Sequence, residues 1–299
     1  MEASLAYKTK KIVEKYGFSF KKNFGQNFLV DERVLGKIVS SAEISKDDVV
    51  IEVGPGIGTL TQALAKEAYK VVAVEIDTTL VPILGELLSD FDNIEIINED
   101  ILKVDVNAIA EKYPDKKIKM VANLPYYITT PIIMNVLENH IPVESITVMI
   151  QKEVAYRMKA QPSTKDYGSL SLAVQYYCEP YLVANVPQNC FMPRPNVDSA
   201  VIKLTVMDKP KVQVNNEKFM FEFIKAAFSQ RRKTLVNCIF SSGLLTLSKD
   251  EIGKMLNGLG YDERVRGESL TLEDYGKITD EAEKYKVKRN ICPNYLILY

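Results

Sequence analysis

Residues 49–58 read Val-Val-Ile-Glu-Val-Gly-Pro-Gly-Ile-Gly, an apolar run that leads directly into a turn with three glycines. The run at 49–53 predicts a buried strand, and the pattern at 59–68 predicts a helix after the turn. Glycine lets a ligand approach the backbone more closely than a residue with a side chain allows. The stretch therefore favours an α/β fold that binds a nucleoside-type cofactor at Gly54 and Gly56. The alternative is a glycine turn that only packs the helix on the sheet.

The alternation of apolar runs and helical patterns continues along the first two-thirds of the chain. Further strands are predicted at residues 71–76, 94–97, 118–122, 146–150, 181–186 and 199–206. Fully apolar strands that are separated by helices are typical of a parallel sheet covered on both faces. The last two strands are expected to form an antiparallel pair at the sheet edge. We therefore predict a doubly wound, mostly parallel sheet.

The character of the chain changes at a polar hinge around residues 208–216. Beyond this hinge the patterns are helical, with candidate helices at 219–227, 251–259 and 272–285. A chain of 299 residues suits about two domains. We expect a cofactor-binding catalytic domain at 1–210 and a smaller α-helical domain at 211–299.

The charge of the chain is nearly balanced, with a net charge of −1, so a nucleic-acid surface would have to be local. Residues 1–25 carry six lysines and two acids, and Lys21 and Lys22 belong to this basic segment. A second basic group, Arg231, Arg232 and Lys233, stands within a helical pattern. A solvated surface is the ordinary interpretation of either group, and RNA binding is the alternative.

The cysteines and the single histidine argue against two common kinds of site. Cys178, Cys190, Cys238 and Cys292 form no C-x-x-C pair, and His140 is the only histidine. We therefore expect neither a structural zinc site nor a histidine-based triad, and we expect no bound metal ion. The start of the chain lacks the apolar core of a signal peptide, and no apolar run approaches the length of a membrane span. We expect a cytoplasmic protein with reduced thiols and no membrane partner.

Acidic residues stand at the ends of three successive predicted strands: Glu52, Glu75 and Asp100. An acid in the position of Glu75 can accept both ribose hydroxyls of a bound adenosine. Asp100 can accept from an adenine amine, or it can cap the segment that follows. Three like charges argue against a triphosphate ligand, and the chain offers no G-K-[ST] motif in compensation. Cationic S-adenosylmethionine suits these acids better.

The tetrapeptide Asn123-Leu124-Pro125-Tyr126 follows the predicted strand at 118–122. An amide oxygen and a backbone carbonyl can accept the two hydrogens of an exocyclic amine, and an aromatic ring can stack on the base. A turn that only closes a buried strand is the alternative. Together with the acids, the tetrapeptide indicates a pocket for a methyl donor and a flat base.

Five motifs in this order resemble the rRNA adenine dimethyltransferase family, over about residues 18–275. The last of them is similar to the branch that acts on the small-subunit (16S) rRNA. The motifs are Asn23-Phe24-Gly25-Gln26-Asn27-Phe28-Leu29, residues 52–58, Asn123-Leu124-Pro125-Tyr126, residues 191–201 (FMPRPNVDSAV) and residues 228–235 (FSQRRKTL). The resemblance implies a Rossmann-like class I methyltransferase fold with a C-terminal helical domain.

The resemblance also implies a role for each matching position. Asn27 and Leu29 would line the methionine end of S-adenosylmethionine, and Gly54 would pass beneath it. Asn123 would face both the methyl donor and the target base, with the carbonyl of Leu124 or Pro125 as second acceptor. The rings of Tyr126 and Phe191 would stack on the two faces of the base. Lys21, Lys22, Arg231, Arg232 and Lys233 would contact RNA.

The implied activity is dimethylation of two adjacent adenosines in the 3′-terminal hairpin loop of 16S rRNA, within the assembling small ribosomal subunit. Transfer from a sulfonium needs positioning of the amine and no general base, so the scarcity of histidine is consistent with it. A monomer is expected. Two alternatives stay open: a large-subunit rRNA methyltransferase that confers antibiotic resistance, and a mainly non-catalytic small-subunit assembly factor. A nicotinamide dehydrogenase is disfavoured, because the glycine spacing departs from G-x-G-x-x-G.

Overall fold

The structure is a computed structural model that describes residues 3–17 and 25–287. The predicted RNA contacts Lys21 and Lys22 lie outside the described residues. Two compact units are present: Met1–Ala155 together with Glu179–Val206, and Tyr156–Cys178 together with Met207–Tyr299. We describe each unit by itself.

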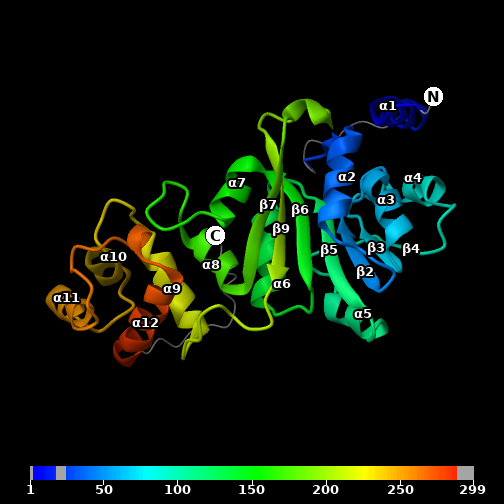
Figure 1. The fold of residues 1–299 in the computed structure, drawn as a ribbon. Coiled ribbons are helices and arrows are strands. Elements are labelled where there is room, and N and C mark those ends of the chain that lie inside the picture. The colour runs from blue at the N-terminus through cyan, green and yellow to red at the C-terminus, as the bar shows by residue number, and fades with distance from the viewer. Residues whose placement is uncertain (1–2, 18–24, 288–299) are drawn as a thin grey trace. The chain divides into compact units, whose positions relative to one another are not determined.

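The first unit is built on a seven-stranded sheet with the order β4-β3-β2-β5-β6-β9-β7 (Figure 1). Strands β4, β3, β2, β5 and β6 are parallel to one another, and β9 runs antiparallel to β6. The strands are β2 (Asp48–Val53), β3 (Lys70–Val74), β4 (Ile94–Ile97), β5 (Lys117–Asn123), β6 (Ser145–Gln151), β7 (Cys178–Val186) and β9 (Ser199–Val206). The predicted doubly wound, mostly parallel sheet is confirmed.

The central strands are buried because apolar residues point to both of their faces. Every residue of β2 is buried, and β5 and β6 are exposed only at their ends. Helices connect the parallel strands, and on one face α2 contacts β6 while α3 contacts β3. The helices of this unit are α1 (Leu5–Lys15), α2 (Glu32–Ser41), α3 (Thr59–Glu67), α4 (Val81–Leu87), α5 (Val106–Lys112) and α6 (Thr129–Glu138), followed by α7 (Lys152–Met158), which crosses into the second unit.

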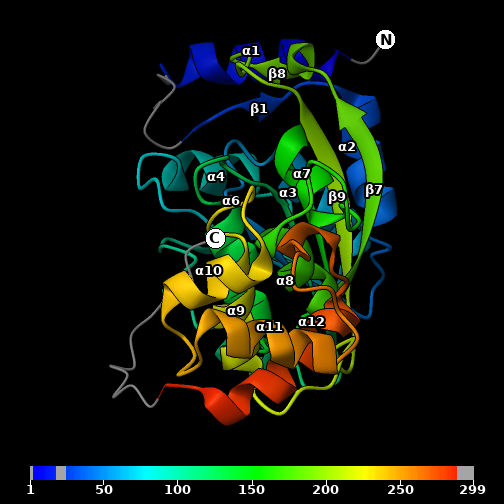
Figure 2. The same ribbon diagram turned by 90° about the vertical axis from the view of Figure 1, so that its left-hand side faces the viewer.

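A two-stranded ribbon brings together segments that are more than 160 residues apart in sequence. Strand β1 (Phe28–Leu29) pairs antiparallel with β8 (Phe191–Met192), and the two strands are labelled in Figure 2. In this pairing Leu29 lies opposite Phe191. Both residues are buried in the hydrophobic core that also holds Val121, Met149 and Val201. The ribbon therefore fixes the N-terminal segment beside the carboxyl ends of the central strands.

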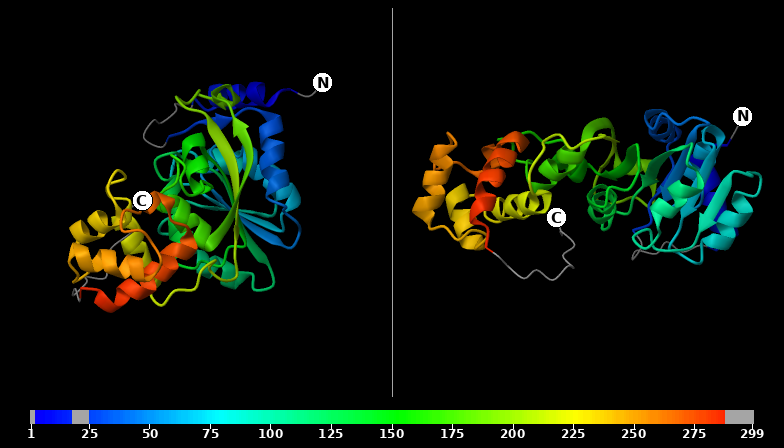
Figure 3. Two further views of the ribbon diagram at one scale, coloured as in Figure 1. Left: turned by 60° about the vertical axis from the view of Figure 1, so that its left-hand side comes forward. Right: turned by 90° about the horizontal axis from the view of Figure 1, so that it is seen from below.

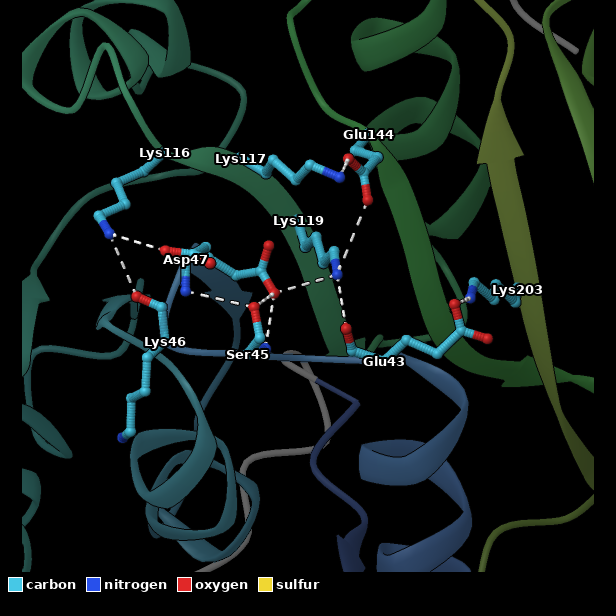
Figure 4. A network of polar contacts seen from close by, with 10 residues as sticks. Glu43, Ser45, Lys46, Asp47, Lys116, Lys117, Lys119, Glu144 and Lys203 are labelled. Atoms are coloured by element: carbon cyan, nitrogen blue, oxygen red, sulfur yellow. Dashed lines mark hydrogen bonds and ion pairs between the residues drawn. The ribbon is translucent and has the colours of Figure 1, made fainter.

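A buried ion pair joins β2 and β5 at their amino ends (Figure 4). The Nζ atom of Lys119 donates to the Glu43 carbonyl at 2.6 Å and lies 3.1 Å from Oδ2 of Asp48. The same Oδ2 accepts from the backbone N–H of Ser45 at 2.6 Å. Further hydrogen bonds offset the cost of burying the pair at Nζ of Lys119 and Oδ2 of Asp48, whereas Oδ1 of Asp48 is buried without a hydrogen-bond partner among the described residues. This network lies at the end of the sheet opposite to the strand ends that carry Glu75 and Asn123.

The second unit consists mainly of helices (Figure 3). Its elements are α8 (Ser169–Tyr177), α9 (Glu217–Ala227), α10 (Leu235–Ser242), α11 (Lys249–Gly258) and α12 (Leu272–Ala282). Four of these helices begin with a side-chain cap, which satisfies backbone N–H groups that a helix start leaves open. The caps are Asn216, Thr234, Ser248 and Thr271. The predicted C-terminal helical region is present.

The division into units departs from a single boundary at residue 210. Helix α8 belongs with the C-terminal helices, since it contacts both α9 and α12. The hydroxyls of Tyr176 and Tyr177 donate to the carboxylate of Glu217, at 3.1 Å for Tyr176 and 2.5 Å for Tyr177. The chain thus enters the helical unit, returns to the sheet through β7 and β9, and enters it again.

The basic group at residues 231–233 does not lie in a helix, and that expectation was wrong. Helix α9 ends before Phe228, and the hydroxyl of Thr234 accepts from the backbone N–H of Asn237 to begin α10. The extended backbone of Thr234, with ψ of 156°, interrupts the helical path. The three basic residues therefore form a turn between two helices.

In the described part of the chain, no helix has both the length and the apolar character that crossing a bilayer requires.

Candidate active site

A cavity opens at the carboxyl ends of β2, β3, β4 and β5. Strand order reverses between β2 and β5, and such a point leaves a crevice in which α/β proteins bind ligands. The empty space of the cavity, with the solvent at its mouth included, is about 1120 Å³. Every residue predicted from the sequence for the cofactor lines it: Asn27, Leu29, Gly54, Gly56, Glu75, Asp100 and Asn123.

The glycine turn after β2 leaves its backbone open to the cavity. Gly54, Gly56 and Gly58 all have positive φ, at 67°, 61° and 79°. A Cβ atom built on Gly54 would meet no other atom within 4 Å, so the space beside this backbone is free for a ligand. A Cβ atom on Gly56 would come within 2.9 Å of the Phe28 ring. Gly54 therefore offers a surface to a ligand, while Gly56 is required by packing.

Glu75 follows β3 and is only 5% exposed. Its Oε1 accepts from the backbone N–H of Asp77 at 2.8 Å, and its Oε2 accepts from the N–H of Gly56 at 3.3 Å. Burial raises the pKa of this carboxyl, while the two N–H groups act in the opposite direction. Each oxygen keeps a second lone pair, so the carboxylate can accept a pair of neighbouring hydroxyls.

Asp100 and an apolar side chain form another part of the wall. The Oδ1 atom of Asp100 accepts from the N–H of Leu102 at 3.0 Å, so the aspartate does cap the turn that follows β4. Its second oxygen is still available to a ligand. Ile76 lines the same cavity and is 45% exposed, which is unusual for a large apolar side chain. An acceptor beside an apolar surface suits a base with an amino group.

The segment that contains Asn27 is held against the end of β5. The side-chain Nδ2 of Asn123 donates to the backbone carbonyl of Asn27 at 2.9 Å, and Nδ2 of Asn27 donates to the carbonyl of Gly25 at 2.9 Å. Gly25, with φ of 59°, faces the side chains of Pro125 and Tyr127. Because the amino group of Asn123 is bound to a carbonyl, its Oδ1 is the atom left to accept from a ligand.

The two carbonyls that were predicted as second acceptor differ in their surroundings. The carbonyl of Pro125 accepts from the N–H of Ile128 at 3.2 Å and from Oγ1 of Thr129 at 3.2 Å. Both of its lone pairs are therefore in use. Among the described residues none donates to the carbonyl of Leu124, so this oxygen is the better candidate for an incoming amine.

The two predicted stacking rings are in different environments. Tyr126 lines the cavity, and burial raises the pKa of its hydroxyl. Phe191 is 6% exposed, packs in the core opposite Leu29, and is not among the residues that line the cavity. The ring of Phe191 is therefore not available to a base in this arrangement, and its visible function is to support β1.

The predicted basic residues of the second unit also differ. The guanidinium of Arg231 donates to the carbonyls of Lys165 and Tyr167, at 2.7 and 3.2 Å, and pairs with Glu268 at 3.3 Å. These bonds tie the loop at residues 161–168 to the turn after α9. The side chains of Arg232 and Lys233 are exposed and form no hydrogen bond or ion pair with a described residue. An anion can therefore reach both of these side chains.

Sequence reasoning missed several residues of the cavity. Gln26 donates to Oδ2 of Asp77 at 3.1 Å, and Tyr127 lines the wall with 59% of its surface exposed. Gln26 belongs to the motif at residues 23–29 and was given no role of its own, while Tyr127 only stands beside the predicted Tyr126. Glu52 was predicted only as one of three acids; it lines the cavity and is 1% exposed. Within the described ranges, no group of His, Cys, Asp and Glu residues is arranged to hold a metal ion.

Comparison with known families identifies a match over most of the chain. Residues 17–279 match the family model described as ribosomal RNA adenine dimethylase. The chain is 58% identical over 274 residues to the ribosomal RNA small subunit methyltransferase A of Lachnoclostridium phytofermentans. The aligned region covers 91% of this chain and 94% of that protein. It is 54% identical over 273 residues to the protein of the same name from Clostridioides difficile, with coverage of 91% and 94%.

Two solved structures have similar folds over most of this chain. One is a dimethyladenosine transferase from Plasmodium falciparum, with a TM-score of 0.71 and 27% identity, over 86% of this chain and 98% of that one. The other is the 23S rRNA methyltransferase ErmE, with a TM-score of 0.66 and 26% identity, over 86% of this chain and 100% of that one. The similarity to these two structures covers both the sheet and helical parts of the sequence.

Proposed function

We propose that this chain, which belongs to the ribosomal RNA adenine dimethylase family, dimethylates the exocyclic amines of two adjacent adenosines in the 3′-terminal hairpin loop of small-subunit (16S) rRNA. The observation that carries the proposal is the orientation of Asn123. Its amino group is bound to the Asn27 carbonyl, so its Oδ1 is left as an acceptor in a cavity that Glu75 and Asp100 also line. An amide oxygen in this place suits an amine donor rather than a phosphate.

The residues around the cavity fit S-adenosylmethionine. Glu75 would hold the two ribose hydroxyls, and Asp100 with Ile76 would hold the adenine by its amine and its face. Asn27 and Leu29 would line the methionine end, where the space beside Gly54 is open. When bound, this cofactor supplies a methyl group on a sulfonium, which is already a good leaving group.

The chain contributes placement of the target amine. Oδ1 of Asn123 and the carbonyl of Leu124 accept the two amine hydrogens, which turns the nitrogen lone pair out of conjugation with the ring and toward the methyl group. The proton that the product must release goes to solvent, so no general base is needed before transfer. Tyr126 stacks on the base, and such stacking is worth about 1–3 kcal/mol toward the cost of extruding it from RNA.

The proposed substrate is tested by methyl transfer to small subunits that lack the modification. With labelled S-adenosylmethionine, the label should enter 16S rRNA as dimethyladenosine, at two adjacent positions found by primer extension. Large-subunit RNA is the matched alternative, because ErmE has a similar fold. Label in 23S rRNA alone would assign the chain to the large-subunit activity, and absence of label from both RNAs would refute an rRNA methyltransferase.

We also propose that Arg232 and Lys233 bind the RNA backbone. Replacement of both residues by Ala should weaken RNA binding about tenfold at low salt. It should also make the slope of log affinity against log salt concentration shallower, by about the contribution of two phosphate contacts, since each replacement removes one cation. Methyl transfer at saturating RNA should stay unchanged. Filter binding at several salt concentrations measures both quantities.

The control removes the same charge elsewhere in the second unit, at the exposed Lys254 and Lys277. If replacement of Lys254 and Lys277 weakened RNA binding equally, the proposed contact of Arg232 and Lys233 with RNA would be contradicted, because the loss would reflect only the total charge. Arg231→Ala is a separate case, since its guanidinium holds the loop at 161–168 and its loss should lower stability.

A further inference from the structure

The segment at residues 191–199 contacts the cavity wall at both of its ends. At its start, β8 pairs with β1, whose residues Phe28 and Leu29 line the cavity. At its end stands Ser199, the first residue of β9. Since Phe191 is buried and does not line the cavity, the contribution of this segment to the site has to come through other contacts.

Ser199 is completely buried, and its Oγ lies 2.7 Å from the hydroxyl oxygen of Tyr126. Either hydroxyl can be the donor. The backbone beside it is fixed, because Ser199 lies opposite Gln151 in the sheet and the carbonyl of Asp198 accepts from the N–H of Lys152 at 3.0 Å. The serine hydroxyl therefore has a defined position from which to hold a partner.

The side chain of Tyr126 is held at two ends: its Cβ is joined to the backbone, and its hydroxyl is hydrogen-bonded to Ser199. Its backbone follows the end of β5, three residues after Asn123, and its hydroxyl is at the far tip of the ring. A ring that is bound only through its Cα–Cβ bond can rotate about two torsions. A hydrogen bond at the tip restricts both of them, and so fixes the plane on which a base would stack.

We propose that Ser199 is a positioning residue for Tyr126, and that it sets the orientation of the ring against which the target base is held for methyl transfer. This inference rests on the proposed function. The motif at residues 191–201 would thus act on the base through Ser199. A purely structural alternative is that the two hydroxyls only satisfy each other, in which case their loss would change stability and leave the transfer step unchanged.

The test is a double-mutant cycle with Ser199→Ala, Tyr126→Phe and the double variant. Tyr126→Phe keeps the ring and removes only the bonded oxygen. Each single change should lower kcat for methyl transfer roughly 3- to 10-fold, as expected for one lost hydrogen bond, with KM for S-adenosylmethionine unchanged. The double variant should be no slower than the singles, since both changes remove the same bond. Ser199→Thr, which restores a hydroxyl at a strand position, should recover most of kcat.

A second measurement does not depend on RNA. In protein with ¹³C-labelled tyrosine rings, the Tyr126 resonance is assigned by its loss in Tyr126→Phe. It should shift and narrow in Ser199→Ala, because the ring becomes freer to reorient. Ser145→Ala is the matched control, since Ser145 is also buried and lies at the far end of β6; it should change neither kcat nor this resonance.

Three results would overturn the proposal: full kcat in Ser199→Ala, additive losses in the double variant, or losses of kcat that follow only the change in unfolding midpoint. Failure of the proposed function would give a different result: the unmodified protein would be inactive on rRNA. The tyrosine resonance would still report the contact between Ser199 and Tyr126.

Discussion

Asn123→Ala is expected to lower the rate constant for methyl transfer roughly 100- to 1000-fold, which is the usual loss when one preorganised polar group is removed from a reacting centre. The amide oxygen of Asn123 is the acceptor that orients the amine. Its loss also frees the carbonyl of Asn27, which accepts from Nδ2 at 2.9 Å. Single-turnover transfer to unmodified small subunits, with RNA and cofactor both saturating, separates the loss of rate from any loss of affinity.

RNA binding by Asn123→Ala should stay within about twofold of the unmodified protein, since Arg232 and Lys233 are unchanged. Asn139→Ala, at an exposed asparagine after α6, is the control and should retain full activity. A normal transfer rate in Asn123→Ala would contradict the positioning role. Full rescue of a strain that lacks the protein by an inactive Asn123→Ala would favour the assembly-factor alternative instead.

Glu52→Gln is expected to stabilise the fold at alkaline pH and to have little effect at acidic pH. Burial raises the pKa of the Glu52 carboxyl to about 8, and the nearby Glu75 adds to the shift. No described group forms a hydrogen bond with Oε2 of Glu52. Thr61 lowers the pKa of this carboxyl but does not outweigh the effect of burial, so the folded protein keeps the proton up to about pH 8.

The sign of the pH dependence follows from that raised pKa. Between the ordinary value of 4.5 and about 8, the folded protein holds a proton that the unfolded chain has released. Stability is therefore lost as the pH rises through this window, at up to about 1.4 kcal/mol per pH unit. Glutamine cannot ionise, so the variant does not lose this stability. The free energy of unfolding of the variant, relative to that of the unmodified protein, should therefore be roughly 3 kcal/mol higher at pH 8 than at pH 5.

Urea unfolding at pH 5 and pH 8 measures this difference. Glu67→Gln, at an exposed position on α3, should show no comparable pH-dependent gain. An equal free energy of unfolding for Glu52→Gln and the unmodified protein at pH 8 would show that Glu52 ionises in the fold at little cost.

The sheet was predictable because its central strands β2, β5 and β6 are buried on both faces. Apolar runs of four to six residues with helices between them leave few arrangements other than a covered parallel sheet. Predicted strands such as 94–97 match β4 in full, and 118–122 lies within β5. Short elements that depend on a distant partner were missed: β1 and β8 have only two residues each, and only their mutual pairing makes them strands.

Helices α8 and α10 were also missed, for a different reason. Helix α8 is buried on almost all sides, so the contrast between an apolar and a polar face is weak. The basic residues 231–233 stand within a helical sequence pattern, whereas in the structure they form a turn and the cap at Thr234 starts a new helix. Both errors come from tertiary packing and capping that override a periodic pattern.

The sequence by itself determined the fold class and the cofactor side of the cavity. Strand, glycine turn, helix and strand-end acids are local features, and parallel strands must bring their carboxyl ends to one edge. Only the tertiary structure decided which atoms face that cavity. It showed that the Asn123 amino group is bound to Asn27, that the Pro125 carbonyl is occupied, and that Phe191 is buried while Ser199 holds Tyr126. Such assignments depend on contacts between distant segments, such as the one between Asn27 and Asn123, 96 residues apart, whose geometry no local pattern contains.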